Sequence, residues 1–223
     1  MISWGMLVRK PPPATTSARG ATALAHWLPQ AEIRPNQISI LSILFAGLAG
    51  LCLVLSTGGG ETWRIALLLA AALLIQLRLL ANLLDGMVAI EGGLGTRSGE
   101  VCNEFPDRLS DVLILVGAGY SVTSLGWGPE LGWVAAVLAV LTAYVRALGA
   151  SLGTAHYFCG PMAKPQRMAA ITLACLFSGL EILLGWPPLA MPVALGIIVA
   201  GSLATVVRRI AAIVTELEGN SRC

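Results

Sequence analysis

Six apolar runs, each long enough to cross a membrane as a helix, dominate this chain of 223 residues. The runs are Ile38–Ser56, Trp63–Leu84, Leu109–Leu125, Leu131–Leu152, Met168–Trp186 and Leu189–Ile213. Because lipid offers no partner to backbone N–H and C=O groups, each run is expected to be helical. Hydrophobic residues make up 56% of the chain and charged residues 12%, far from the composition of a water-soluble domain. The sequence therefore predicts an all-α fold: a polytopic integral membrane bundle of six transmembrane helices.

The two ends of the chain lie outside the apolar runs. We expect residues 1–34 to form a cytosolic tail, residues 35–216 one membrane domain, and residues 217–223 a second cytosolic tail. In the first tail, Ala18–Leu28 has the pattern of an amphipathic helix on the membrane surface, with Trp27 as an interfacial anchor. A tail without regular structure fits the same residues. The net charge of +2 is too small to suggest a nucleic-acid partner.

Lys and Arg residues gather on one side of the predicted topology. That side carries Arg9, Lys10, Arg19, Arg34, Arg97, Arg108, Lys164, Arg167, Arg208, Arg209 and Arg222, and the loops of the other side carry only Arg64. Since basic residues are enriched in cytoplasmic loops, both termini are expected in the cytosol. The predicted location is a bacterial-type inner (cytoplasmic) membrane, with the polar loop between the second and third runs facing the cytosol.

Polar residues interrupt the apolar pattern around that loop. The second run ends in Asn82-Leu83-Leu84-Asp85-Gly86-Met87-Val88-Ala89, and Gly99-Glu100-Val101-Cys102-Asn103-Glu104-Phe105-Pro106-Asp107 precedes the third. Asn82 and Asp85 are three residues apart and Asn103 and Asp107 four, so each pair shares one face of a helix. Ionisable groups are costly at membrane depth and usually mark a site. Carboxylate and amide oxygens suit Mg²⁺ or Mn²⁺, and with the metal a phosphate substrate.

These segments resemble the motif of the CDP-alcohol phosphotransferases, integral membrane enzymes that displace CMP from a CDP-linked donor. The family pattern is D-x-x-D-G-x-x-A-R, eight residues, then G-x-x-x-D-x-x-x-D. Its spacing is fully kept, and its residues are matched by Asp85, Gly86, Ala89, Gly99 and Asp107. Asn82 and Asn103 stand at two of the Asp positions, and Ile90 replaces the Arg. Pro35-Asn36 resembles the family's entry into its first span, and Gly160–Arg167 its later basic loop, so the resemblance covers most of the chain.

The resemblance implies a role for each matched position. The metal ligands would be Asn82, Asp85, Asn103 and Asp107, and the nucleotide donor would lie against Asn36, Gly86, Ala89 and Gly99. Asp107 is also the expected general base for the acceptor hydroxyl. The phosphate of a phosphorylated acceptor would be bound by Arg146, Lys164 and Arg167. Anchoring at the membrane surface is the alternative for Lys164 and Arg167.

Two cations inside the apolar runs need partners, because an unpaired charge there is costly. Arg146 is expected to face a phosphate or a carboxylate such as Asp111 or Glu181. Arg78 is expected to pair with Asp107, Asp111 or a donor phosphate.

The two Asn residues weaken the electrostatic hold on a cation, because an amide oxygen ligates without negative charge. Glu100, Glu104 and Asp111 recur at helical spacing with Asp107, so one of them could supply a compensating oxygen. A second interpretation is that the site is degraded and the protein non-catalytic.

By resemblance, the expected activity is metal-dependent transfer of a phosphatidyl group from a CDP-linked lipid, CDP-diacylglycerol in first place, to an alcohol. The leading acceptor is glycerol 3-phosphate, CMP is released, and the role is in phospholipid biosynthesis. A homodimer is expected because family members commonly form one. The rival hypothesis is a non-catalytic relative that binds nucleotide or lipid and scaffolds or regulates a membrane lipid synthase.

Overall fold

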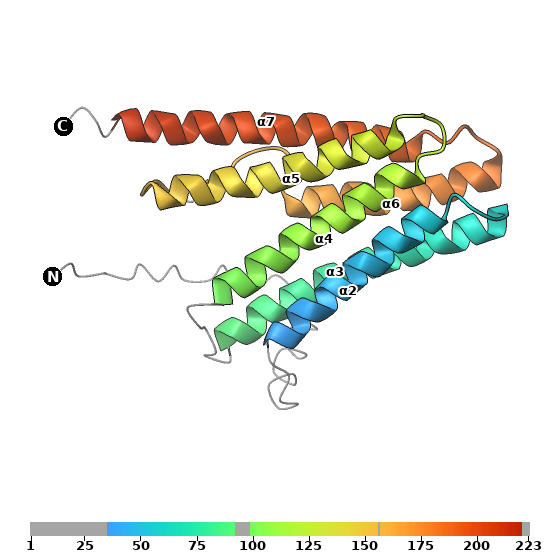
Figure 1. The fold of residues 1–223 in the computed structure, drawn as a ribbon, viewed down its shortest axis with the longest axis horizontal. Coiled ribbons are helices and arrows are strands. Elements are labelled where there is room, and N and C mark those ends of the chain that lie inside the picture. The colour runs from blue at the N-terminus through green and yellow to red at the C-terminus, as the bar shows by residue number, and fades with distance from the viewer. Residues whose placement is uncertain (1–34, 92–98, 156, 220–223) are drawn as a thin grey trace, which may run out of the picture.

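Six helices make up the part of the chain that the computed structural model describes, which is residues 35–91, 99–155 and 157–219. They are α2 (Pro35–Leu55), α3 (Glu61–Glu91), α4 (Gly99–Ser121), α5 (Gly128–Ser151), α6 (Lys164–Leu184) and α7 (Ala190–Gly219). These residues contain no strand. The helices run lengthwise through one elongated bundle (Figure 1). The all-α prediction is confirmed.

The helices pack in an order that follows the chain only in part. α2 lies against α3 and α4, α4 also lies against α5, and α7 contacts both α5 and α6. α3 also lies against α6. The connections α2–α3, α4–α5 and α6–α7 lie at one end of the bundle, and the C-terminal end of α3 and the first turn of α4 lie at the other (Figure 1). The motif positions therefore belong to this second end.

Helix boundaries follow the turn residues of the sequence. Proline occupies the first turn of α5 and of α6, where its missing N–H costs no helical hydrogen bond. α6 ends at Gly185, which has φ of 65°, a left-handed conformation that glycine adopts without a steric penalty.

Small residues form the contacts between neighbouring helices. A Cβ atom on Gly117 would lie 2.6 Å from the carbonyl oxygen of Gly50, and one on Gly119 would lie 2.7 Å from the Cα of Gly132. These distances leave no room for a side chain, so glycine lets α4 approach both α2 and α5 closely. Such close backbone packing is typical of helices associating in lipid.

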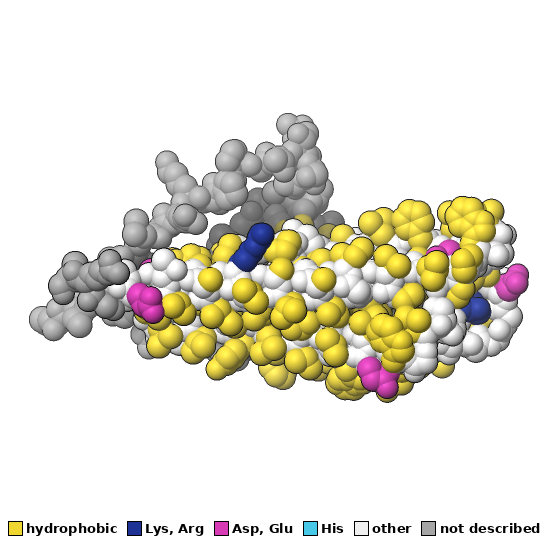
Figure 2. All heavy atoms as spheres, turned by 90° about the horizontal axis from the view of Figure 1, so that it is seen from above, with side chains coloured by type: hydrophobic (Ala, Val, Ile, Leu, Met, Phe, Trp, Pro, Cys, Tyr) yellow, Lys and Arg dark blue, Asp and Glu magenta, His cyan; other side chains and the backbone are white. Residues whose placement is uncertain are grey.

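The outward surface is apolar along most of the bundle. Large hydrophobic side chains are exposed on every described helix, among them Leu44, Leu73, Val137, Leu183 and Val207. Figure 2 shows one such face, where hydrophobic side chains cover the length of the helices and few charged side chains interrupt them. This is the arrangement expected of a bundle surrounded by hydrocarbon, and the chain is an integral membrane protein.

Four helices meet the length and composition of membrane spans: Glu61–Leu84 within α3, and α5, α6 and α7. α2 contains a shorter apolar stretch, Ser39–Leu55. α4 begins at Gly99, ten residues before the predicted third run. The predicted run started late because the residues before Leu109, which include Asp107 and Arg108, are polar. Four of the six predicted spans thus have the length and composition needed to cross a membrane, and the count of six stays a prediction. α7 continues to Gly219, so three residues of the predicted C-terminal tail are helical.

Candidate active site

Two carboxylates on α4 face arginines from α3 and α6. Arg78 of α3 donates to Asp111 Oδ1 at 3.0 Å, to Asp107 Oδ1 at 3.4 Å and to the backbone carbonyl of Asp107 at 3.2 Å. Arg167 of α6 donates to Asp111 Oδ2 at 2.9 Å. The partners predicted for Arg78 are confirmed, since Asp107 and Asp111 are the two carboxylates that sequence spacing suggested.

Asp111 is the centre of this arrangement. It is 1% exposed, Arg78 is 0% exposed and Arg167 is 2% exposed. Each of its oxygens takes one arginine, which compensates the large cost of burying a single charge. Arg167 also donates to the hydroxyl of Thr142 and to the carbonyl of Met162. The three charged groups thus form one hydrogen-bonded unit that joins α3, α4 and α6.

Asp107 lies one turn before Asp111 and is 8% exposed. Lys164, the first residue of α6, places its Nζ 2.5 Å from Asp107 Oδ1, the same oxygen that Arg78 contacts. Among the described residues, no ion pair involves Oδ2 of Asp107. One carboxylate oxygen is therefore held by two cations, and the other is not engaged by them.

A second ion-pair group lies nearer the surface. Arg146 of α5 donates to Glu104 Oε1 at 2.6 Å, and Arg108 donates to the other oxygen of Glu104. The Arg146 guanidinium also lies over the ring of Phe158, 5.1 Å from its centroid, which is within the range of a cation–π contact. The carboxylate partners suggested for Arg146, Asp111 and Glu181, are both incorrect: Arg146 meets Glu104, because α4 begins early enough to place that residue beside α5.

Arg209 is a buried cation that the sequence reasoning counted only toward membrane topology. It is 5% exposed, and it donates to the carbonyl oxygens of Cys159 at 3.0 Å and Thr142 at 2.5 Å. Thr142 therefore contacts Arg209 through its carbonyl and Arg167 through its hydroxyl. The signal in the sequence was the spacing of Ser202, Thr205 and Arg209, which puts three polar residues on one buried face of α7.

Hydrogen bonds join the segment between α5 and α6 to α7. This segment leads directly into Lys164, the first residue of α6, and so helps to position it. The Tyr157 hydroxyl donates to Glu216 at 2.6 Å, and the N–H of Met162 donates to Thr205 at 3.0 Å. The hydrogen bond to the Glu216 carboxylate raises the pKa of Tyr157, because losing the phenolic proton would break that bond.

The remaining predicted ligands are placed by the backbone alone. Asp85, Gly86 and Ala89 lie in the last part of α3, Gly99, Glu100 and Asn103 in the first part of α4, and Asn36 in the first turn of α2. Their side chains lie outside the described part of the structure. Asn82 is half-buried on α3, one turn after Arg78. In the described residues, no group of three His, Cys, Asp or Glu side chains is arranged to hold a metal ion.

The residues present fit a hard divalent cation in ligand type. The motif brings two carboxylates and two amides to one end of the bundle, and Asp107 keeps an oxygen outside its ion pairs. Such oxygen sets suit Mg²⁺ or Mn²⁺. Of the compensating ligands suggested by the sequence, Glu104 and Asp111 each have two arginine partners in this structure.

Comparisons with known proteins agree with this architecture, although no family model matches the chain. A phosphatidylinositol phosphate synthase of Corynebacterium glutamicum is 30% identical over 185 residues, which are 80% of this chain and 77% of that protein. The phosphatidylinositol phosphate synthase of Mycobacteroides abscessus is 27% identical over 209 residues, 90% of this chain and 86% of that protein.

The fold is shared with crystal structures of the Mycobacterium tuberculosis phosphatidylinositol phosphate synthase. The structure with CDP-DAG bound has a TM-score of 0.70 and 24% identity, over 88% of this chain and 94% of that one. The structure in complex with manganese and citrate has a TM-score of 0.71 and 22% identity, over 87% and 89%. The motif spacing is kept, and the motif lies at the end of the bundle where Asp107 pairs with Arg78 and Lys164. The chain belongs to the CDP-alcohol phosphotransferase family and is a membrane transferase of that type.

Proposed function

We propose that this protein transfers a phosphatidyl group from CDP-diacylglycerol to a phosphorylated alcohol and releases CMP. The observation that carries the proposal is Asp107, which holds the last motif position and is flanked by Arg78 and Lys164. The relatives named phosphatidylinositol phosphate synthases support the reaction type, and the related crystal structure with CDP-DAG bound supports the donor. Their name favours a phosphorylated inositol as acceptor over glycerol 3-phosphate, the leading acceptor from the sequence.

The reaction is a displacement at phosphorus. The acceptor hydroxyl oxygen forms a bond to the phosphorus that carries diacylglycerol, and the bond from that phosphorus to the CMP oxygen breaks. Asp107 would take the hydroxyl proton through the carboxylate oxygen that Arg78 and Lys164 do not contact. Arg78 and Lys164 fix the orientation of the carboxylate, so this oxygen is held in one place before the substrates bind.

A bound Mg²⁺ or Mn²⁺ would neutralise the negative charge that develops on the departing CMP. Asn82, Asp85, Asn103 and Asp107 would hold it. Manganese in the related crystal structure supports this choice of metal. The same end of the bundle would bind the nucleotide of the donor, with Gly86, Ala89 and Gly99 allowing the backbone close to the phosphates.

The function is tested with the purified full-length protein, labelled CDP-diacylglycerol, and Mn²⁺ or Mg²⁺. The acceptors would be inositol phosphate, glycerol 3-phosphate, inositol, glycerol and serine, each at the same concentration. We expect CMP release that needs both the metal and a phosphorylated acceptor. No CMP release with any acceptor would support the rival hypothesis of a non-catalytic relative.

Arg146 offers the clearest test of the acceptor site, because Arg167 is buried among Asp111, Thr142 and Met162 and its loss would also disturb packing. Arg146→Ala is expected to raise the KM for the phosphorylated acceptor by about 10–100-fold, the value of a lost charge-assisted hydrogen bond. The KM for CDP-diacylglycerol should change much less. Both constants come from steady-state CMP release.

Arg108→Ala is the matched control for Arg146→Ala, because Arg108 contacts the same Glu104 carboxylate. Its acceptor KM should stay within a few-fold of the wild-type value. An equal rise of both KM values in Arg146→Ala would assign Arg146 to the donor, and an equal acceptor KM rise in both variants would assign the effect to Glu104.

The two Asn ligands predict a weak metal site. Asn103→Asp would add a negative charge next to the predicted cation, so the metal concentration for half-maximal CMP release should fall. Mn²⁺ should support activity at lower concentration than Mg²⁺ in both forms, because it binds nitrogen and oxygen ligands more tightly. A metal titration of both forms measures this.

An unchanged titration in Asn103→Asp would remove Asn103 from the ligand set. The double variant Asn82→Asp, Asn103→Asp distinguishes a tuned site from a degraded one. CMP release by the double variant alone would show that the wild-type site has lost activity through these two positions.

The orientation in the membrane is proposed from the basic residues. Arg78, Arg108, Arg146, Lys164 and Arg209 all belong to the site, and we place this end of the bundle in the cytosol, where CMP and water-soluble acceptors are found. Reporter fusions after Thr57, Gly126 and Trp186 should then read as non-cytosolic, and fusions near Gly93, after Ala163 and at the C-terminus as cytosolic. A cytosolic signal after Gly126 would contradict both the orientation and the span count.

A further inference from the structure

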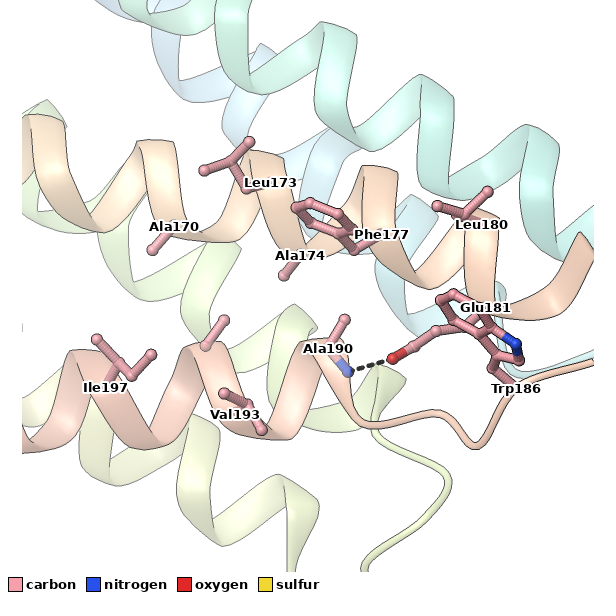
Figure 3. Close-up of a pocket in the computed structure, with 11 residues that line it drawn as sticks. Ala170, Leu173, Ala174, Phe177, Leu180, Glu181, Trp186, Ala190, Val193 and Ile197 are labelled. Carbon is pink, nitrogen blue, oxygen red and sulfur yellow. Dashed lines mark hydrogen bonds between the residues drawn. The ribbon is translucent and has the colours of Figure 1, made fainter. Parts of the chain in front are cut away.

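A groove of about 390 Å³ runs along the surface between α6 and α7 (Figure 3). Four alanines, Ala170, Ala174, Ala190 and Ala194, form part of its lining, and Ala174 and Ala194 are 3% and 9% exposed. Large side chains, including Leu173, Phe177, Val193 and Ile197, are more than half exposed and rise along its edges. Small residues at the base and large ones at the rim make a narrow apolar channel.

The groove leads away from the candidate active site. Glu181 lies seventeen residues after Lys164 on α6, roughly 26 Å along the axis at about 1.5 Å per residue. Glu181 and Trp186 close this far end, beside the start of α7 (Figure 3). Tryptophan is favoured at the level of lipid headgroups, so the far end of the groove belongs to the membrane interface opposite the site.

At the far end of the groove, the two carboxylate oxygens of Glu181 differ in their hydrogen bonding to the described residues. Its Oε1 accepts from the backbone N–H of Leu189 at 3.1 Å and of Ala190 at 2.8 Å, and so caps the start of α7. Its Oε2 is buried and has no hydrogen-bond partner among the described residues. Leaving a buried carboxylate oxygen unpaired costs free energy, and a donor from outside the chain would remove that cost.

We propose that this groove binds phosphatidylethanolamine from the leaflet opposite the active site. One acyl chain lies in the apolar channel, and the ammonium group donates to Oε2 of Glu181 after a side-chain movement at this end of the groove exposes that oxygen. The ammonium group supplies both the missing donor and the opposite charge, which a choline headgroup without N–H or an anionic headgroup does not supply together. The groove is a lipid site separate from the one that binds the donor.

The test uses full-length protein in nanodiscs of fixed composition. A trace lipid carries a photoactivatable diazirine in one acyl chain, with either an ethanolamine or a glycerol headgroup, and labelled peptides are mapped by mass spectrometry. We expect the ethanolamine lipid to label residues 170–197 about 10–100-fold more than the glycerol lipid, the ratio for one charge-assisted hydrogen bond. Equal labelling by the two lipids overturns the proposal.

Two variants separate the headgroup contact from the channel. Glu181→Gln keeps a carbonyl oxygen to cap α7 but loses the charge, so the labelling ratio should fall to about one. Ala170→Phe fills the channel and should lower labelling by both lipids, whereas Ala169→Phe, at the exposed neighbour outside the lining, should not. A labelling ratio that Glu181→Gln leaves unchanged overturns the headgroup assignment.

Competition decides between this lipid and other occupants. An excess of CDP-diacylglycerol should leave the labelling of residues 170–197 unchanged. Displacement by CDP-diacylglycerol would make the groove part of the donor site, and cross-links between two protein copies in place of lipid labelling would make it a dimer contact. Either result overturns the proposal, and neither depends on enzymatic activity.

Discussion

Asp107→Asn is expected to lower the kcat for CMP release by at least about 10²–10⁴-fold, the usual contribution of a general base. The amide keeps the shape of the side chain but has neither the charge nor the basicity of a carboxylate. The site around it also depends on that charge, because Arg78 and Lys164 both contact Oδ1 of Asp107. Single-turnover CMP release at saturating metal and donor measures the effect on chemistry.

The loss must be separated from misfolding. Asp107→Asn should elute as the wild-type protein does in size-exclusion chromatography, because its Oδ1 can still accept from Arg78 and the Asp111 ion pairs remain. Wild-type turnover in a folded Asp107→Asn protein would exclude Asp107 as the base. The base would then be Glu104 or Asp111, or the catalytic interpretation would have to be abandoned.

Much of the fold could be predicted, because a helix that crosses lipid needs a long apolar run, and such runs can be recognised in a sequence. Long apolar runs placed all six described helices, in most cases within a few residues of their ends. The first half of α4 is the largest exception, since it is polar and no apolar pattern marks it as helical. An apolar window cannot detect such a segment, so its start was predicted ten residues late.

The candidate site was predictable where spacing along one helix decides it. The interval between Asp107 and Asp111 put both carboxylates on one face, and the cost of an unpaired Arg78 identified its partners. Contacts between distant helices were not predictable in the same way. Arg146 pairs with Glu104, and Arg209 donates hydrogen bonds to two backbone carbonyls. These contacts depend on how α5 and α7 pack, which no local sequence pattern predicts.

Asp111→Ala is expected to destabilise the protein by about 3–5 kcal/mol, the usual cost of removing one partner from a buried ion pair. The variant would leave Arg78 without its shortest ion pair and Arg167 without a carboxylate, at positions 0% and 2% exposed. For a chain of this size, about 2–4 °C is lost per kcal/mol, so the midpoint of thermal unfolding in detergent should fall by roughly 6–20 °C.

Glu104→Ala is the matched control for Asp111→Ala, because Glu104 also binds two arginines but its side chain is 51% exposed. Water stabilises Arg108 and Arg146 when Glu104 is gone, so the expected loss is within about 1 kcal/mol. Replacing Arg167 by Leu in the Asp111→Ala background should recover part of the midpoint, since one unpaired buried charge is then removed. Equal shifts in Asp111→Ala and Glu104→Ala would contradict this account, because burial alone distinguishes the two groups.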